Sequence, residues 1–409
     1  MKILVIADSY PPDHSGGYGL RCLNVVDGLR KRGYEICVIT TVPRDNLDPM
    51  VSHVYKIIRR LHRRTPGNHI RIWDEYRDLK VIDEEIREFR PDVIYLWNLL
   101  CLARSIFPYL AEANLPVVYD EGAKGLAKAW SLKIRWLEVI GRKSKSPLKN
   151  NVKQFLGYVV YRLSGGLFKK QWLWPKINVY FNSELGLLNA RQQAIPLDKM
   201  SVIHSGINIA LFPYKEPEIC GSTLRIVHPG RMEEQKGVED SILLVRKIKD
   251  LSISAHLTIV GEISSVSYLE KINRMVKENG VTDRVEYFPP VSQGELVEYY
   301  HNSDFCFFPS YYKQGLSRIP LEAMACGSLV VTYGNEGSNE IIRDHQTGII
   351  VPEGNIDEAV IQIAELVKNP EQKKTIIQSA RRVIEEKHAM EPYIDSIETF
   401  LYESIKGGQ

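Results

Sequence analysis

Short apolar runs rich in β-branched residues alternate with longer amphipathic segments along most of this chain. The alternation is typical of parallel sheets whose strands are joined by crossover helices. Between the first two runs, Leu20–Gly33 has apolar residues at helical spacing and ends in a glycine, so we predict a helix there. We predict strands in the first half at Lys2–Ala7, Glu35–Thr41, Val93–Trp97, Val117–Asp120, Val179–Asn182 and Ser201–His204.

A second series of runs follows with the same alternation. At 409 residues the chain is too long for one ordinary hydrophobic core, so two α/β domains, each with a doubly wound parallel sheet, are the simplest account. Sheets of this kind bind ligands at the carboxyl ends of their strands. The strands predicted for the second series are Leu224–His228, His256–Val260, Val285–Phe288, Phe305–Pro309, Leu329–Thr332 and Gly348–Val351.

The predicted hinge lies near Gly206–Pro213, where strand signals give way to glycine, asparagine and proline. We therefore predict domains at residues 1–208 and 209–388. A last helical pattern, within residues 389–409, includes Pro392–Ile405. We expect this final helix to return to the first domain.

Several classes of function are disfavoured by what the sequence lacks. The six cysteines form no CxxC pair, which favours reduced thiols and a cytoplasmic protein. No Asp-x-Asp and no regular histidine spacing occur, so we predict no catalytic metal. Gly17-Tyr18-Gly19 has Cys22 where a dinucleotide fingerprint needs glycine, which argues against NAD. The sequence contains no run of 18 apolar residues, so we predict no membrane-spanning helix.

The net charge of +3 is unevenly distributed. Residues 122–176 contain 13 Lys or Arg and one acid, Glu138, so this segment carries 13 − 1 = +12 and the rest 3 − 12 = −9. Aromatic residues are interleaved with the charge. Basic, aromatic helices often lie on anionic membrane surfaces or hold anionic ligands, although a solvated face is the alternative. No nucleic-acid-reading motif accompanies the charge, so we expect no nucleic-acid partner.

A loop with two cations follows the strand predicted at Leu224–His228. Arg231 and Lys236 stand five residues apart, after Gly230 and before a helix that begins near Val238. Both could face a pyrophosphate, the arginine through its planar fork and the lysine as a point charge. The alternative is an exposed loop with surface cations.

A second loop, after the strand at Phe305–Pro309, leads into an apolar helix that Gly327 ends. Glu322 lies inside this helix among small apolar residues. An unpaired buried carboxylate is costly, so Glu322 needs a partner. A pair of ligand hydroxyls, such as those of a ribose, would satisfy it, and a buried salt bridge is the alternative.

At this point the chain resembles the family-four retaining glycosyltransferases of the GT-B fold, in which two Rossmann-like domains face each other across a cleft. Each motif alone is weak, but the ordered set spans nearly the whole chain. The set consists of the Pro11-Pro12 to Gly16-Gly17 loop, Pro91–Ile94, Val202–Asn208, Gly230-Arg231 with Lys236-Gly237, Leu257–Gly261, Pro309-Ser310, Leu321–Gly327 and Thr347-Gly348.

The resemblance implies a nucleotide-sugar donor as co-substrate and no cofactor. The first domain would lie on the acceptor side, and the second would bind the donor. By resemblance, Arg231 and Lys236 would neutralise the diphosphate and Glu322 would hold the ribose hydroxyls. The other implied donor-binding residues are Gly16 and Gly17 of the first domain, the amides of Gly315, Leu316 and Ser317, the sugar-facing Gln314, and the loop around Pro290, against which the base would lie.

Two positions depart from the family pattern. Gln314 stands where the family has the first glutamate of a Glu-x₇-Glu pair, which keeps hydrogen bonding but removes a negative charge. The histidine that the family often places after the fourth strand is missing. In that region Asp120 or Glu121 takes the role, or no residue does, and we name Asp120 as the candidate.

We therefore predict a retaining, metal-independent transferase that moves a hexose or N-acetylhexosamine, with a UDP-linked donor preferred. The acceptor would be lipid-linked, a polysaccharide or another hydroxyl compound, and the basic segment would place the protein at the inner face of a membrane. Two alternatives stay open. One is a nucleotide-sugar-binding scaffold subunit without activity, and the other is a nucleotide-sugar epimerase on the same fold.

Overall fold

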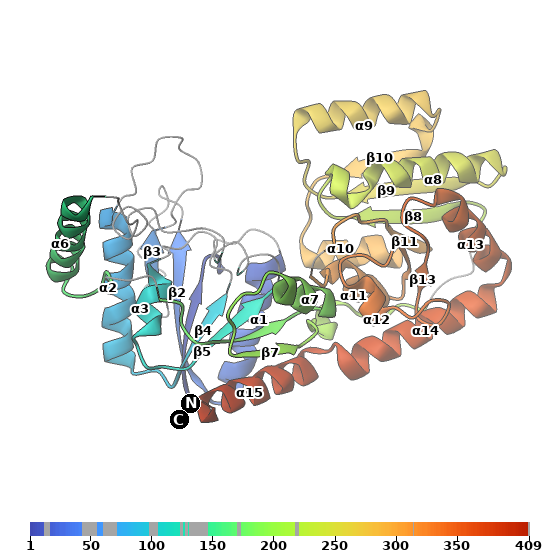
Figure 1. Ribbon diagram of the computed structural model, residues 1–409. Helices are drawn as coiled ribbons and strands as arrows, with labels where there is room; N and C mark the ends of the chain where they lie inside the picture. Colours follow the sequence, from blue (N-terminus) through green and yellow to red (C-terminus); the bar gives the residue numbers. More distant parts are fainter. Residues whose placement is uncertain are drawn as a thin grey trace. The chain divides into compact units, whose positions relative to one another are not determined.

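The computed structural model describes residues 1–11, 17–42, 55–59, 72–97, 105–122, 126, 130, 146–169, 173–216, 221–313 and 315–407. The chain divides into two compact units. Unit 1 comprises Met1–Ile203 together with Ile394–Gln409, and unit 2 comprises His204–Tyr393. Each unit is an α/β layer structure with its own parallel sheet (Figure 1).

Unit 1 contains a seven-stranded sheet in the order β3-β2-β1-β4-β5-β6-β7, with every neighbouring pair parallel. The order grows outward in both directions from β1 and β4, which is the doubly wound arrangement. All five residues of β4 are buried, as expected for a central strand covered on both faces. The strands are β1 (Lys2–Ala7), β2 (Glu35–Val42), β3 (Tyr55–Arg59), β4 (Val93–Trp97), β5 (Val117–Glu121), β6 (Ile177–Phe181) and β7 (Lys199–Val202).

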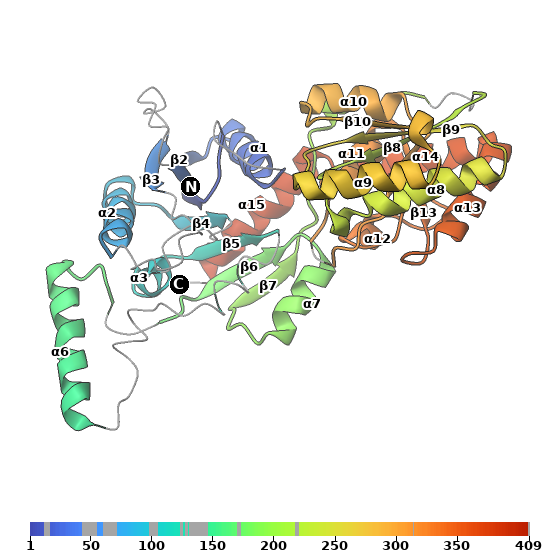
Figure 2. The same ribbon diagram turned by 90° about the horizontal axis from the view of Figure 1, so that it is seen from above.

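The described helices of unit 1 lie around this sheet, and α6 extends away from it (Figure 2). The last helix, α15 (Met390–Lys406), belongs to unit 1 from Ile394 onward. Its Phe400 ring meets Tyr180 of β6, and Glu398 pairs with Arg32 at 2.6 Å. The other described helices of unit 1 are α1 (Gly17–Lys31), α2 (Ile72–Phe89), α3 (Ile106–Ala111), α6 (Pro147–Leu163) and α7 (Glu184–Gln192).

Unit 2 repeats the doubly wound plan with six parallel strands in the order β10-β9-β8-β11-β12-β13. The two units therefore confirm the predicted fold class of two Rossmann-like α/β domains. The strands are β8 (Leu224–Pro229), β9 (Ala255–Val260), β10 (Val285–Phe288), β11 (Phe305–Phe308), β12 (Leu329–Thr332) and β13 (Ile349–Ile350).

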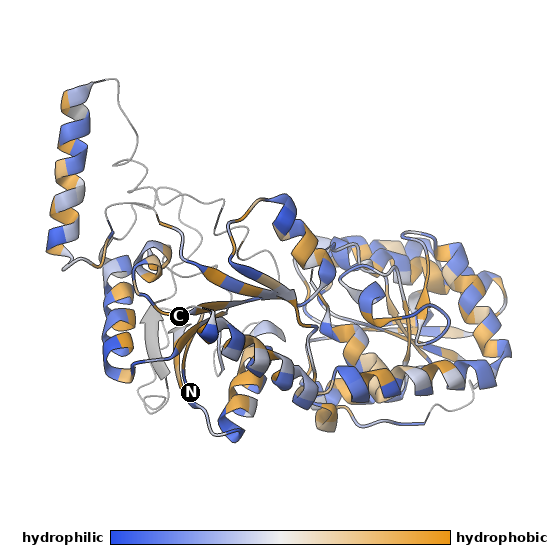
Figure 3. Ribbon diagram, turned by 60° about the horizontal axis from the view of Figure 1, so that its bottom comes forward, coloured by the Kyte–Doolittle hydropathy of each residue, from blue (hydrophilic) through white to orange (hydrophobic). Residues whose placement is uncertain are grey.

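Two apolar clusters cover the faces of the unit 2 sheet, one built around α8, α9 and α13 and the other around α10, α11 and α14. The helices show apolar and polar stripes, as amphipathic crossover helices do (Figure 3). They are α8 (Val238–Asp250), α9 (Val266–Glu278), α10 (Gln293–His301), α11 (Arg318–Cys326), α12 (Ser338–Ile341), α13 (Ile356–Lys368) and α14 (Pro370–Lys387).

The predicted strands are confirmed, with ends that shift by one or two residues. The prediction missed β3, a short strand at the edge of the described sheet that pairs with β2 and carries Lys56 and Arg59 among its five residues. The first helix begins at Gly17 rather than Leu20. Among the described helices, none is both long and apolar enough to cross a bilayer.

Candidate functional site

The carboxyl ends of β8 and β9 carry glycines because the backbone is crowded there. Gly230 has φ 122° and Gly261 has φ 158°, and a Cβ on Gly261 would collide with the carbonyl oxygen of Gly230. Gly237 ends the loop that starts at Gly230. It adopts φ 69°, and a Cβ there would collide with the carbonyl oxygen of Pro309. These close approaches bring the β8 and β11 loops together at one edge of the sheet.

The two cations of the β8 loop differ in their surroundings. The Arg231 side chain is 59% exposed and pairs with Glu233 at 3.1 Å. The Lys236 side chain is only 12% exposed and lies in a short 3₁₀ turn, Glu234–Lys236, that precedes α8. Its ammonium lies 4.9 Å from the ring centre of Tyr312. Both cations lie on the loop after β8, one exposed and one held within it.

Glu336, which the sequence motifs did not single out, is the partner of Lys236. Its Oε1 lies 2.6 Å from the ammonium and accepts a second hydrogen bond from Ser310 at 2.8 Å. The residue is 5% exposed and has φ 52°, an uncommon conformation for a residue with a side chain. The signal available in the sequence was weak: an acidic residue in the Gly334–Gly337 turn after β12.

The loop after β11 carries the amides predicted to hold phosphate. Gly315 has φ 50°, and Leu316 is buried. Ser317 is the N-cap of α11, and its N–H donates to the carbonyl oxygen of Glu336 at 3.0 Å. This amide is therefore engaged within the protein. Gln314 lies outside the described residues.

Glu322 is buried in α11, as its sequence surroundings predict. Its carboxylate accepts hydrogen bonds from Arg318 Nε at 3.0 Å and from the Tyr300 hydroxyl at 3.4 Å. Burial raises the pKa of Glu322, and the charge of Arg318 opposes that rise. Nη1 of Arg318 is buried without a hydrogen-bond acceptor among the described residues. The Glu322 carboxylate, which already has partners, thus lies beside Nη1 of Arg318, and an oxygen of a ligand could accept from that nitrogen.

Pro290 lies in the loop after β10 and is exposed. Its strand is next to β9, so this loop also emerges from the carboxyl edge of the unit 2 sheet. The unit therefore brings Arg231, Lys236, Pro290 and the Gly315–Ser317 loop to one edge, the edge at which doubly wound sheets bind ligands.

In unit 1 the predicted site residues lie at the carboxyl edge of β5 and the start of α1. Gly17 is the first residue of α1 and is exposed, whereas Gly16 lies outside the described residues. Asp120 is fully buried and forms an ion pair with Arg21. The Tyr18 hydroxyl donates to the Asp120 carboxylate at 3.0 Å.

The surroundings of this ion pair exclude solvent. The Arg21 guanidinium lies 5.2 Å from the Trp97 ring centre, and its side chain is 3% exposed. Direct contact between Asp120 and a substrate would require the pair to open. The catalytic role of Asp120 therefore stays a prediction. The geometry more directly indicates that Arg21 and Tyr18 hold the Asp120 side chain in place.

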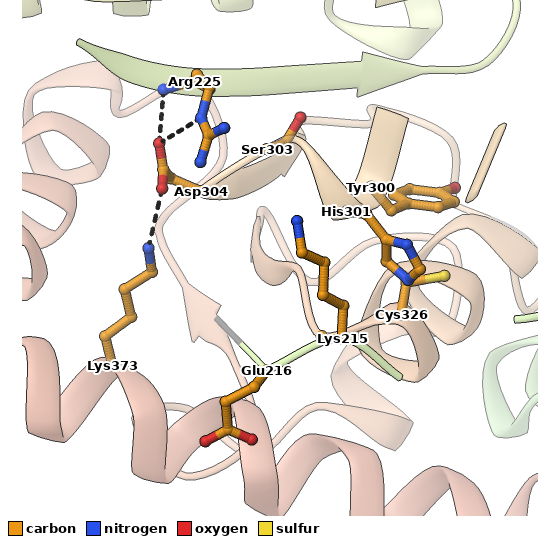
Figure 4. Close-up of a pocket in the computed structure, with 10 residues that line it drawn as sticks. Lys215, Glu216, Arg225, Tyr300, His301, Ser303, Asp304, Cys326 and Lys373 are labelled. Carbon is orange, nitrogen blue, oxygen red and sulfur yellow. Dashed lines mark hydrogen bonds and ion pairs between the residues drawn. The ribbon is translucent and has the colours of Figure 1, made fainter. Parts of the chain in front are cut away.

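A polar pocket lies at the opposite, amino-terminal edge of the unit 2 sheet (Figure 4). Its charges are compensated internally. Asp304 accepts from the backbone N–H of Arg225 at 2.8 Å and from its Nε at 3.4 Å, and Lys373 lies 3.5 Å from the other carboxylate oxygen. We regard this network as structural, because it ties α14 to the starts of β8 and β11.

Metal ligands do not gather in the part of the chain that the structure describes. No group of three or more His, Cys, Asp or Glu residues there could hold a metal ion. The described groups at the carboxyl edge of unit 2 include cations and backbone N–H groups, which bind phosphate oxygens.

Comparisons with known proteins match both units. Residues 215–383 match the family described as "Glycosyl transferases group 1", and residues 15–120 match "Glycosyltransferase Family 4". A glycogen synthase of Mycobacterium tuberculosis is 23% identical over 368 residues, which are 85% of this chain and 82% of that protein.

Solved structures share the fold over nearly the entire chain. Sucrose-phosphate synthase from Thermosynechococcus elongatus superposes with a TM-score of 0.71 at 16% identity and covers 100% of both chains. Anabaena HepE, in complex with UDP and glucose, gives a TM-score of 0.68 at 16% identity and covers 98% of this chain and 100% of its own. With both units matched in order, the chain belongs to glycosyltransferase family four, and it is a glycosyltransferase of the GT-B fold.

Proposed function

We propose that this glycosyltransferase moves a hexose or N-acetylhexosamine from a UDP-linked donor, which binds at the carboxyl edge of unit 2. The observation that carries the proposal is the convergence of Lys236, Arg231 and the Gly315–Ser317 amides at that edge. The UDP and UDP-glucose complexes of Anabaena HepE, a protein of the same fold, support the choice of UDP.

In this proposal Glu322 and Arg318 bind the ribose. The Glu322 carboxylate accepts from two hydroxyls, and the buried Nη1 of Arg318 donates to one of their oxygens. This assignment uses the buried Nη1 of Arg318, which lacks an acceptor within the described protein. Such a group costs free energy until a ligand satisfies it.

The proposed mechanism is retaining and needs no enzyme nucleophile. The acceptor hydroxyl attacks from the face that the diphosphate leaves, so the new bond has the configuration of the old one. This differs from retaining glycosidases, which use two carboxylates about 5 Å apart. The protein's task is then to stabilise negative charge on the leaving diphosphate, which Arg231 and Lys236 can do without a metal.

The experiment that tests the donor site is a panel of UDP-glucose, UDP-N-acetylglucosamine, UDP-galactose and GDP-mannose. Each donor is screened for thermal stabilisation and for release of nucleoside diphosphate. Stabilisation by one donor, with diphosphate release, is the expected result. Binding without turnover would favour the scaffold alternative, and conversion of the donor sugar without acceptor would favour the epimerase.

Substitution of the cations tests the mechanism. We expect Arg231→Ala and Lys236→Ala each to lower turnover by about 10²–10³-fold, equivalent to roughly 3–4 kcal/mol of transition-state stabilisation. Lys271→Ala is the matched control, because Lys271 is a surface cation of α9 that pairs with Glu234 and Glu239. Near-normal turnover in both Arg231 and Lys236 variants would overturn the assignment.

The proposed acceptor is lipid-linked or a polysaccharide at an anionic membrane surface, and α6 supports this. Its apolar residues at positions 148, 152, 155, 156 and 163 recur at helical spacing and form one face. Each of these side chains is between 51% and 81% exposed.

The opposite face of α6 turns toward unit 1. There Gly157 is buried, and Val160, at the margin of the stripe, packs against the unit 1 core. The apolar stripe therefore points away from the described part of unit 1. Residues Pro147–Leu163 contain three basic residues and no acid, within a segment that carries a charge of +12. An outward apolar stripe on a basic helix is typical of helices that lie in the lipid interface.

Sedimentation with vesicles tests this surface. We expect the protein to bind vesicles that contain anionic lipid, to bind less at higher salt, and to lose binding in a Phe155→Ser/Leu156→Ser variant. Val266→Ser/Ile361→Ser is the control, because both of these exposed apolar residues lie in unit 2. Vesicle binding that survives the α6 substitutions would show that α6 is not the contact surface. Absence of vesicle binding at low salt would contradict the proposed membrane association.

A further inference from the structure

Glu336 binds two of the groups that the proposed donor site would use. Its carboxylate holds the Lys236 ammonium at 2.6 Å, and its carbonyl oxygen accepts the Ser317 N–H at 3.0 Å. Its own N–H donates to the carbonyl oxygen of Tyr312 at 3.0 Å. One residue of the β12 loop therefore contacts both the β8 loop and the β11 loop.

The chemistry of these contacts resembles that of a bound anion. The Glu336 carboxylate accepts from Lys236, and the Glu336 carbonyl oxygen accepts from the N-cap amide of α11. These are donors that phosphate oxygens would otherwise take. The Lys236 and Glu336 side chains are 12% and 7% exposed, so solvent screens their attraction only in part. A diphosphate that approaches Lys236 must share the ammonium with Glu336 or displace it.

The backbone of Glu336 makes this placement costly for a residue with a side chain. Its φ of 52° lies in the left-handed region, which glycine adopts more readily. The conformation persists because the two backbone hydrogen bonds and the Lys236 pair hold it.

We propose that Glu336 is a positioning residue that competes with the donor's diphosphate for Lys236 and thereby weakens the hold on the nucleotide. The inference rests on the proposed donor site. The carboxylate keeps the Lys236 side chain extended toward the edge of the sheet while the site is empty. After transfer it returns to the ammonium and favours release of the nucleoside diphosphate.

The test measures UDP binding by calorimetry in the full-length protein. Glu336→Gln keeps the length of the side chain and a hydrogen-bond acceptor but removes the charge. We expect it to bind UDP on the order of tenfold more tightly than the wild type, because an adjacent negative charge has been removed. The KM for the donor should fall in parallel, and kcat should fall as release slows.

A double-mutant cycle with Lys236→Met isolates the competition. In the Lys236→Met background, Glu336→Gln should bring no gain in UDP affinity. Glu336→Gly provides a second variant, since it removes the charge and also suits the positive φ. Glu353→Gln is the matched control. It removes a carboxylate of the loop after β13 that pairs with Lys313 of the β11 loop at 3.2 Å, and it should leave UDP affinity within about twofold.

Binding of inorganic pyrophosphate, measured beside UDP, distinguishes a wrong role for Glu336 from a wrong assignment of the donor site. If UDP binds the wild type but Glu336→Gln and Glu336→Gly bind it no more tightly, the competition is wrong and the donor site stands. The competition is equally wrong if the gain persists without Lys236. If no nucleotide binds any variant, yet pyrophosphate stabilises Glu336→Gln more than wild type in a Lys236-dependent way, the competition stands and the nucleotide donor is wrong.

Discussion

Each unit of this protein has a buried ion pair near the carboxyl edge of its sheet, but the two pairs differ in their access to solvent. Arg21 and Asp120 in unit 1 are 3% and 0% exposed, and the Tyr18 and Trp97 rings lie beside the guanidinium. Lys236 and Glu336 in unit 2 are 12% and 7% exposed and lie in loops. The first pair is enclosed by core residues, whereas the second is reachable.

Access to solvent decides what each pair can do. A fully enclosed pair cannot exchange partners without opening the core, so loss of one partner leaves an uncompensated buried charge. A pair at the edge can exchange a carboxylate for a phosphate at lower cost. We therefore expect the unit 1 pair to govern stability and the unit 2 pair to govern ligand affinity.

The largest expected effect is on the stability of unit 1. Asp120→Asn keeps the shape of the side chain but removes the buried negative charge that pairs with Arg21, so we expect it to lower the free energy of unfolding by about 3–5 kcal/mol. Glu336→Gln, the same chemical change in unit 2, should cost about 1 kcal/mol or less, because Lys236 can reach solvent.

Tryptophan fluorescence measures this difference selectively. All six tryptophans lie between residues 73 and 174, within unit 1, so their signal follows that unit alone. Circular dichroism follows both units in the same denaturant titration. Equal shifts for Asp120→Asn and Glu336→Gln would contradict the distinction between the two pairs.

The next effect is expected from acid, and it should fall on unit 2. Burial, reinforced by the charge of Lys236, lowers the pKa of His228 to about 3. Burial, followed by the charge of His204, lowers the pKa of His388 to about 4. An unfolded histidine takes up its proton near pH 6.5. The unfolded chain thus binds more protons, and stability should fall as the pH drops from about 6.5 toward 4.

The size of this acid effect approaches at most about 1.4 kcal/mol per pH unit for each histidine. Every described histidine belongs to unit 2, so the circular dichroism signal should weaken before the tryptophan signal does. His228→Asn, which can keep a hydrogen bond to Ser241, should flatten the dependence. His345→Asn is the control, because that ring is exposed in the folded protein. An unchanged slope in His228→Asn would contradict the prediction.

The smallest expected effects come from helix caps, which occur in both units. Ser183 accepts from the Gly186 N–H at 3.0 Å at the start of α7, and Ser265 accepts from the Tyr268 N–H at 3.1 Å at the start of α9. Each change to alanine should cost about 1 kcal/mol. The buried Ser183 should cost more than the exposed Ser265, because water can replace the lost acceptor only at the latter. A larger loss at Ser265 would show that exposure does not set these costs.

Much of the fold could be predicted from local sequence, because short apolar strand runs alternate with longer amphipathic helical segments in doubly wound domains. The burial of Glu322 also followed from its apolar neighbours in α11. The donor-site loops could be placed at one edge because the carboxyl ends of parallel strands share an edge. The edge strand β3 escaped because its five residues mix isoleucines with charged residues.

The partners of the charged groups could not be predicted in the same way. Lys236 meets Glu336 across 100 residues of chain, and Arg21 meets Asp120 across 99. Such pairs arise from tertiary packing, and neither spacing nor composition encodes them. For this reason the sequence indicated Asp120 as a candidate for catalysis but did not reveal its ion pair with Arg21.

The division of the chain also bears on its order of synthesis. Unit 2 is continuous from His204 to Tyr393, whereas unit 1 is completed only by residues from Ile394 onward. Those late residues are central to unit 1, since Leu401 is fully buried and Phe400 meets Tyr180. On a ribosome, the first unit to be made is therefore the last to be finished, and unit 2 can fold while the apolar surface that α15 will cover is still exposed.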